Sequence, residues 1–162
     1  MATLLVYMTS HGCTKKAANL IRDLLPGEVR VVNLENSDSP PLDSFDTVII
    51  GGSIRIGTLQ KRIKKYCEKN LETLLSKKIG LFICCMFEKE VAMDQLKRNF
   101  PEILWQHASA LGLFGGELEF EQLNAFERMI INQVANISVD VSSFNEEAVR
   151  EFAERISDAT LI

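Results

Sequence analysis

Short apolar runs alternate along the chain with segments that carry a helical stripe. Residues 3–8, 47–50 and 78–86 are almost wholly apolar and lack polar alternation, which is typical of strands buried on both faces. Residues 28–33 follow a Pro-Gly stop and predict another strand. A fifth strand, weakened by glycines, is expected around residues 111–118.

The segments between these runs repeat apolar residues at helical spacing. In the last of them Val149, Phe152, Ala153 and Ile156 fall at i, i+3, i+4 and i+7, and a Ser-x-x-Glu capping box at residues 143–146 precedes them. The expected helices cover residues 15–25, about 59–70, 91–100, 123–134 and 149–156.

This alternation predicts an α/β fold in one domain spanning residues 1–162. Parallel strands need crossovers, and helical crossovers cover both faces of the sheet. Five strands in this length fit a doubly wound parallel sheet of order 2-1-3-4-5. Ligands of such sheets bind at the carboxyl ends of the strands, near the switch point between strands 1 and 3.

The segment that joins the first strand to the first helix is short, rich in hydroxyl groups and contains one glycine. Backbone N–H groups in the first turn of a helix lack partners within the helix, and the helix dipole favours an anion there. Neither a dinucleotide fingerprint nor a Walker loop is present. One phosphate of a mononucleotide is therefore one interpretation, and a strand–turn–helix with a Ser/Thr cap is the alternative. The candidate phosphate residues are Thr9, Ser10, His11, Gly12, Cys13 and Thr14.

The loops after strands 3 and 4 should converge on the same edge of the sheet. The first of them, residues 51–57, has glycines at both ends, which are expected to permit backbone conformations closed to other residues. A flat ring could lie against Ile54 and Ile56, and Met86 and Phe87 could pack on it from the second loop. The candidate residues of the two loops are Ser53, Ile54, Arg55, Ile56, Gly57, Cys85, Met86, Phe87 and Glu88.

Charge and cysteine usage narrow the class of protein. A net charge of −4 argues against nucleic acid and against simple adsorption to anionic membranes. No apolar run approaches the ~18–20 residues of a membrane span, and no basic leader is seen. The four cysteines offer neither a secreted-domain framework nor C-x-x-C metal spacing, so no metal is expected. A cytoplasmic protein is the simplest interpretation.

Two motifs resemble those of flavodoxin-fold FMN proteins, and the resemblance extends over nearly the whole chain. They are the loop at residues 9–14 and the Gly-Ser-Ile-Arg-Ile-Gly sequence at residues 52–57, supported by residues 115–119 and 126–131. Within that superfamily the chain most resembles the flavodoxin-type, quinone-dependent protoporphyrinogen IX dehydrogenases. The resemblance implies FMN, with its phosphate on the first loop and its isoalloxazine ring between the other two.

The function that the resemblance implies is an FMN-dependent oxidation of a reduced tetrapyrrole, with a quinone or another acceptor taking the electrons. The alternative is a non-enzymatic flavodoxin that carries electrons between redox partner proteins. A receiver-like signalling domain without flavin is a third, less favoured, interpretation. Peripheral contact with a membrane stays open, since a partner could recruit the protein there.

Several residues carry both a functional and a structural interpretation. Cys13 lies at a helix N-terminus, which lowers a thiol pKa, but a small residue is all that the loop requires. Arg55 could balance the FMN charge, bind a substrate carboxylate or form a surface ion pair. The basic run at residues 61–65 is usual for a solvated helix face, but it flanks the second loop, where an anionic partner could bind.

Overall fold

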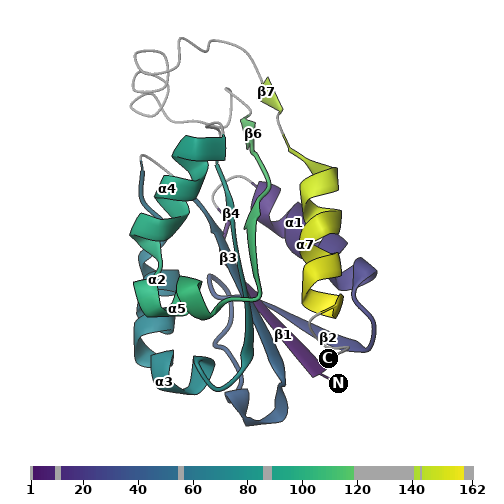
Figure 1. Ribbon diagram of the computed structural model, residues 1–162, viewed down its shortest axis with the longest axis vertical. Coiled ribbons are helices and arrows are strands. Elements are labelled where there is room, and N and C mark those ends of the chain that lie inside the picture. The colour runs from purple at the N-terminus through teal and green to yellow at the C-terminus, as the bar shows by residue number, and fades with distance from the viewer. Residues whose placement is uncertain are drawn as a thin grey trace.

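A five-stranded, all-parallel sheet of order β2-β1-β3-β4-β5 forms the centre of the computed structural model, as the sequence predicts (Figure 1). The structure describes residues 2–9, 12–54, 57–85, 89–118, 141–142 and 144–158. The strands are β1 (Ala2–Tyr7), β2 (Glu28–Asn33), β3 (Thr47–Ser53), β4 (Lys78–Cys84) and β5 (Ala110–Leu113).

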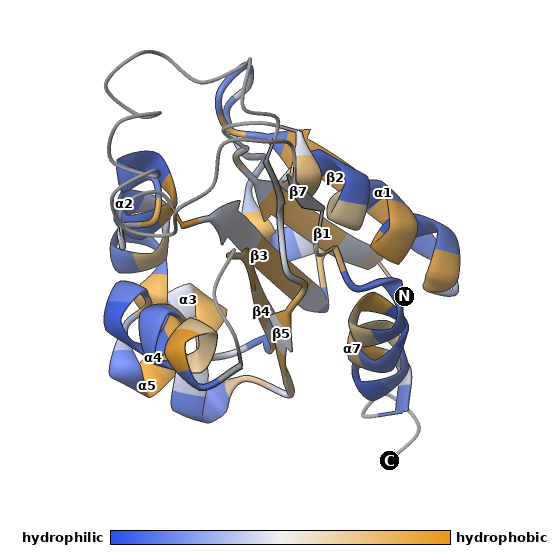
Figure 2. Ribbon diagram, turned by 90° about the horizontal axis from the view of Figure 1, so that it is seen from above, coloured by the Kyte–Doolittle hydropathy of each residue, from blue (hydrophilic) through white to orange (hydrophobic). Residues whose placement is uncertain are grey.

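Helices cover both faces of this sheet. Figures 1 and 2 show α1 and α7 on one side, and α2, α3, α4 and α5 on the other. In Figure 2 the sheet lies between the two groups of helices. The α-helices are α1 (Cys13–Leu24), α2 (Lys61–Lys69), α3 (Leu71–Leu74), α4 (Lys89–Asn99), α5 (Glu102–His107) and α7 (Glu146–Asp158), with one 3₁₀ helix, η1 (Leu42–Ser44).

The central strands place successive side chains in two separate cores. Leu4 and Leu5, adjacent on β1, are both fully buried, and they belong to opposite clusters because side chains alternate across a sheet. Cys84 and Cys85 separate in the same way, as expected for neighbouring residues of an extended chain. Burial on both faces explains why these strands show no polar alternation in the sequence.

Three segments differ from the sequence prediction. The helix expected to reach residue 70 ends one residue earlier, where Asn70 donates a side-chain hydrogen bond to the Tyr66 carbonyl, and α3 follows. Residues 102–107, which lie outside the helices expected from the sequence, form α5. The fifth strand is shorter than expected because Gly115, at φ 74°, interrupts it before β6 (Glu117–Leu118), which pairs antiparallel with β7 (Val141–Ser142).

The C-terminal helix α7 begins with a cap that differs from the predicted capping box. The Asn145 side chain accepts a hydrogen bond from the Ala148 N–H at 3.1 Å, so Asn145 caps the helix, while Ser143 of the predicted box lies outside the described residues. At the other end Lys78 donates to the Ile156 carbonyl, which ties the last turn of α7 to the start of β4. The predicted helix over residues 123–134 lies outside the described residues. None of the described helices is both long and apolar enough to cross a membrane.

Candidate functional site

The loops that follow β1, β3 and β4 meet at one edge of the sheet, as the strand order requires. The ladder of backbone hydrogen bonds continues beyond the strands there. Met8 N–H donates to the Gly51 carbonyl at 3.3 Å, and Ile54 N–H donates to the Cys84 carbonyl at 3.0 Å. Backbone bonds therefore fix the starts of the three loops relative to one another.

The loop after β1 turns into α1 through a left-handed glycine. Gly12 has φ 90° and ψ −17°, and its N–H donates to the Thr9 hydroxyl at 2.8 Å. The N-cap residue of α1 is Gly12, which has no side chain to cap the helix, and the first turn of α1 contains no acidic residue. A Cβ atom at Gly12 would meet nothing within 4 Å. The loop thus brings the N-terminus of α1 and its dipole beside open space, which is a favourable setting for an anion.

The Thr14 side chain adds an unsatisfied group to this loop. Thr14 is fully buried, and in the described part of the chain its hydroxyl oxygen has no hydrogen-bond partner. The Cys84 thiol lies nearby, but a thiol is only a weak partner. A buried hydroxyl without a partner costs about 1–3 kcal/mol, so a group that bonds to it would be stabilising.

Cys13, the first residue of α1, is buried with the core on the α1 side of the sheet. A hydrogen bond with the Cys13 thiol, together with burial, raises the pKa of Cys84 well above its usual range. Both thiols face the core, so the part of Cys13 that an anion could reach is its backbone N–H. This burial agrees with the passive interpretation of Cys13.

The loop after β3 is held at its start by a side chain from the end of the same loop. The Gln60 amide oxygen accepts from the Ser53 N–H at 3.2 Å, and its nitrogen donates to the Ser53 hydroxyl at 2.7 Å. Gln60 also precedes the first residue of α2. The two bonds close the loop into a ring of eight residues, from 53 to 60.

A second brace reaches this loop from α4. The Asn99 side chain accepts a hydrogen bond from the Leu59 N–H at 3.0 Å and donates to the Gly57 carbonyl at 3.1 Å. It also donates to the Gln95 carbonyl at 2.8 Å, one turn earlier in its own helix. Asn99 is only 7% exposed, so these bonds form away from water, where their loss is most costly.

The glycines of this loop serve two different purposes. Only Gly57, at φ 75°, has the left-handed backbone that was expected of this motif. Gly51 and Gly52 lie inside β3, so the expectation that they permit unusual backbone angles is wrong. They are required for packing instead. A Cβ at Gly51 would lie 2.0 Å from the Phe82 ring, and one at Gly52 would lie 2.6 Å from Leu59.

The structure describes part of the predicted site. Ile54 is partly buried and packs against the core on the α2 side, and Cys85 is buried in that same core. Cys85 N–H donates to the Gly115 carbonyl at 2.9 Å, which joins the loop after β4 to the end of β5. The site residues outside the described part of the chain are Ser10, His11, Arg55, Ile56, Met86, Phe87 and Glu88, and their roles stay predictions.

Three polar residues that support the site were missed by the sequence analysis. Gln60 and Asn99 brace the loop after β3, and Gln95 places its side-chain oxygen beside Gly57, where a Cβ would lie 3.6 Å away. That oxygen is buried and has no hydrogen-bond partner among the described residues. The sequence offers little signal for these residues, since Asn99 follows the charged Lys97 and Arg98 near the end of a helix.

Comparison with known proteins agrees with this geometry. A protein family described as the flavodoxin domain matches residues 4–144, which is most of the chain. The chain belongs to the flavodoxin domain family. Membership implies a flavin cofactor, and the family likeness includes the loops after β1, β3 and β4.

Individual relatives are distant but span nearly the whole chain. A protoporphyrinogen IX dehydrogenase [quinone] of Leishmania major is 23% identical, over 93% of this chain and 72% of that protein. The enzyme of the same name from Escherichia coli (strain K12) is 20% identical, over 98% of this chain and 92% of its own length. Among solved structures, oxidised flavodoxin 1 from Bacillus cereus superposes with a TM-score of 0.59 at 17% identity, covering 98% of both chains. At this identity the structural likeness shows the fold alone.

Proposed function

We propose that the protein binds FMN and acts as a flavin-dependent oxidoreductase. The single observation that carries the proposal is the loop after β1, where the N-terminus of α1 adjoins the buried hydroxyl of Thr14, which has no hydrogen-bond partner among the described residues. Both features fit a phosphate, whose oxygens accept hydrogen bonds from amides and hydroxyls. The phosphate would be held by Thr9, Ser10, His11, Gly12, Cys13 and Thr14.

The isoalloxazine ring would lie between the other two loops. The first comprises Ser53, Ile54, Arg55, Ile56 and Gly57, and the second runs from Cys85 to Glu88. Bound FMN would supply the redox chemistry, taking electrons from a reduced donor and passing them to an acceptor. The chain's own part is to orient the ring and limit its exposure to water, and the braces from Gln60 and Asn99 serve that purpose.

The substrate that we propose is a reduced tetrapyrrole of the protoporphyrinogen class, with a quinone or another acceptor taking the electrons. Two dehydrogenases that are named for this reaction match 93% and 98% of the chain, which supports the proposal. A flavodoxin-type electron carrier is the second candidate. It is supported by membership of the flavodoxin domain family, whose match covers residues 4–144.

Thr14→Val tests the phosphate site. Valine keeps the shape of threonine but lacks the hydroxyl, and that hydroxyl has no partner among the described residues. We therefore expect the free energy of unfolding without FMN to stay the same or rise. We expect FMN affinity to fall about tenfold, which corresponds to one lost hydrogen bond to a charged group. Riboflavin, which has no phosphate, should bind both proteins equally.

Thr3→Val, at the opposite end of β1, is the matched control and should bind FMN like the wild type. Wild-type FMN affinity in Thr14→Val would remove the phosphate assignment. Anaerobic addition of protoporphyrinogen IX to the FMN-loaded protein then separates the two candidate functions. Bleaching of the flavin absorption supports the dehydrogenase, whereas an unchanged spectrum favours the electron carrier.

A further inference from the structure

Helix α2 carries an arrangement of charge that does not stabilise the helix itself. Five of its nine residues are Lys or Arg and one is Glu, although the whole chain has a net charge of −4, so the remaining residues sum to −8. Lys61, Lys65 and Lys69 follow one another at i, i+4 spacing, where like charges repel. The first turn holds Lys61 and Arg62 and no acidic residue, which opposes the helix dipole.

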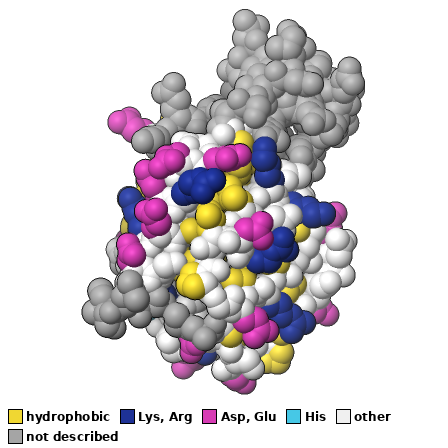
Figure 3. Space-filling view, turned by 90° about the vertical axis from the view of Figure 1, so that its right-hand side faces the viewer, with side chains coloured by type: hydrophobic (Ala, Val, Ile, Leu, Met, Phe, Trp, Pro, Cys, Tyr) yellow, Lys and Arg dark blue, Asp and Glu magenta, His cyan; other side chains and the backbone are white. Residues whose placement is uncertain are grey.

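Few of these charges are neutralised by the part of the chain that the structure describes. Among the described residues, the one ion pair that α2 makes joins Arg62 to Asp38, at a distance of 3.9 Å between atoms whose side chains are both exposed. Glu68 makes no ion pair with any described cation, although Lys64 lies four residues before it. The opposite face of the molecule, over α1 and α7, mixes acidic and basic side chains instead (Figure 3).

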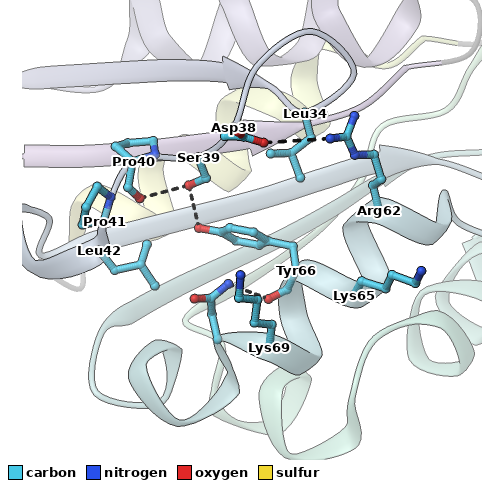
Figure 4. A pocket seen from close by; sticks show the side chains of 11 residues that line it. Leu34, Asp38, Ser39, Pro40, Pro41, Leu42, Arg62, Lys65, Tyr66 and Lys69 are labelled. Carbon is cyan, nitrogen blue, oxygen red and sulfur yellow. Dashed lines mark hydrogen bonds and ion pairs between the residues drawn. The ribbon is translucent and has the colours of Figure 1, made fainter.

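A hollow of about 610 Å³ lies beside this helix, between α2 and the segment that follows β2 (Figure 4). Tyr66 crosses from α2 toward that segment, and its hydroxyl lies 3.0 Å from the Ser39 hydroxyl. Ser39 also donates to the Pro40 carbonyl, so the two hydroxyls are occupied in holding the wall together. The groups left to attract a ligand are the cations that line the hollow, Arg62, Lys65 and Lys69.

We propose that α2 and this hollow form a docking surface for an acidic segment of a partner protein, with carboxylates of that segment against Arg62, Lys65 and Lys69. Charge complementarity is the basis of the proposal, because the surface is strongly basic on an otherwise acidic protein. The helix starts directly after the loop that follows β3, so the partner would lie next to that loop. We take the partner to be a redox protein, and this step alone rests on the proposed function.

The shape of the surface favours a protein over a membrane. Interfacial binding to lipid needs apolar side chains that enter the acyl region. The large apolar side chains that are exposed in the described part of the chain, Val91 and Ile103, belong to α4 and α5 and not to this surface. A hollow with a charged rim suits a projecting carboxylate side chain better than a flat layer of headgroups.

Lys65→Glu tests the proposal in two independent ways. The new carboxylate would lie four residues from both Lys61 and Lys69, so the helix should gain two favourable pairs and the denaturation midpoint should rise. Binding of a fluorescein-labelled decaglutamate peptide, followed by anisotropy at low ionic strength, should weaken about fivefold. A variant that is more stable yet binds less cannot be explained by a role of Lys65 in folding.

Arg30→Glu, on the edge strand β2, changes the net charge by the same amount and should bind the peptide within twofold of the wild type. Amide NMR shifts caused by the peptide should fall on α2 and residues 38–42. Equal weakening by both variants, scattered shifts or no binding at low salt would each overturn the proposal. So would stronger binding of phosphatidylglycerol vesicles that is lost in Lys65→Glu, since it would identify a membrane surface. The binding assay uses protein without added FMN, so its failure is distinct from a failure of the proposed function.

Discussion

Removing the side-chain amide of Asn99, in comparison with an equally destabilising control, should separate its effect on the loop after β3 from its effect on the stability of the fold. Asn99→Leu keeps the branched shape of the side chain, although its methyl groups are larger than the amide, and deletes the bonds to the Leu59 N–H and the Gly57 carbonyl. Leu59 is 1% exposed, so its N–H would be left buried without a partner, at a cost of about 1–3 kcal/mol. With the bonds to Gly57 and Gln95 also lost, we expect the free energy of unfolding to fall by about 3 kcal/mol.

The same substitution should weaken flavin binding, because the loop would no longer be ordered before the ring arrives. Ordering one further residue on binding costs about 1–2 kcal/mol, so FMN and riboflavin affinity should both fall by about tenfold. The assay is fluorescence titration of each flavin, with unfolding by denaturant measured separately without flavin, because a bound ligand raises apparent stability.

Leu74→Ala is the matched control for this experiment. Leu74 is fully buried in α3, which immediately precedes the amino end of β4, so the variant loses a similar 2–5 kcal/mol at the far end of the sheet. It should bind FMN like the wild type under conditions in which it is folded. Equal loss of FMN affinity in both variants would show that instability alone is responsible. An Asn99→Leu protein with wild-type affinity would refute the bracing role.

Two more outcomes follow from backbone conformation and from a buried thiol. Gly12→Ala meets no steric clash but places a Cβ on a backbone with φ 90°. It should therefore lower the free energy of unfolding in denaturant by about 1–2 kcal/mol and weaken FMN binding. An unchanged denaturation midpoint would contradict the strain. Burial raises the pKa of the Cys67 thiol from 9.0 to about 12. Because the thiol ionises in the unfolded state first, its contribution to the free energy of unfolding is present below pH 9 and is lost as the pH rises toward 12. The free energy of unfolding of the wild type should therefore fall, relative to that of Cys67→Ala, by about 1.4 kcal/mol per pH unit over this range. If the two free energies instead change in parallel with pH, the pKa shift is contradicted.

The features that the sequence predicted correctly are set by local chemistry. Strand β2 begins and ends where the prediction placed it, because the Pro-Gly stop before Glu28 is a strong local signal. Helix α1 begins two residues earlier than expected, at Cys13, because Gly12 adopts the left-handed conformation that starts it. The strand order follows from the same alternation of elements, since right-handed crossovers leave few other arrangements.

The features that were missed depend on contacts between distant parts of the chain. Nothing near Gly51 in the sequence indicates that the Phe82 ring from the neighbouring strand occupies the space of its missing side chain. A pair of glycines at the end of a strand was therefore interpreted as a source of backbone freedom, when packing is the reason for both. The break between α2 and α3 was missed for another reason, since Asn70 ends α2 with an interaction that its low helix propensity only weakly indicates.

The two halves of the proposed site also differ in how far apart in the sequence the residues that form them lie. The loop after β1 is built from consecutive residues, with Thr9 and Gly12 bonded to each other three positions apart. The loop after β3 depends on Asn99, whose side chain accepts a hydrogen bond from the N–H of Leu59, 40 residues away in the sequence. Asn99 lies at the end of α4, and α4 starts directly after the loop that follows β4. A movement of α4 would therefore shift both loops that are proposed to hold the flavin ring, whereas the phosphate loop, which belongs to β1 and α1, would keep its place.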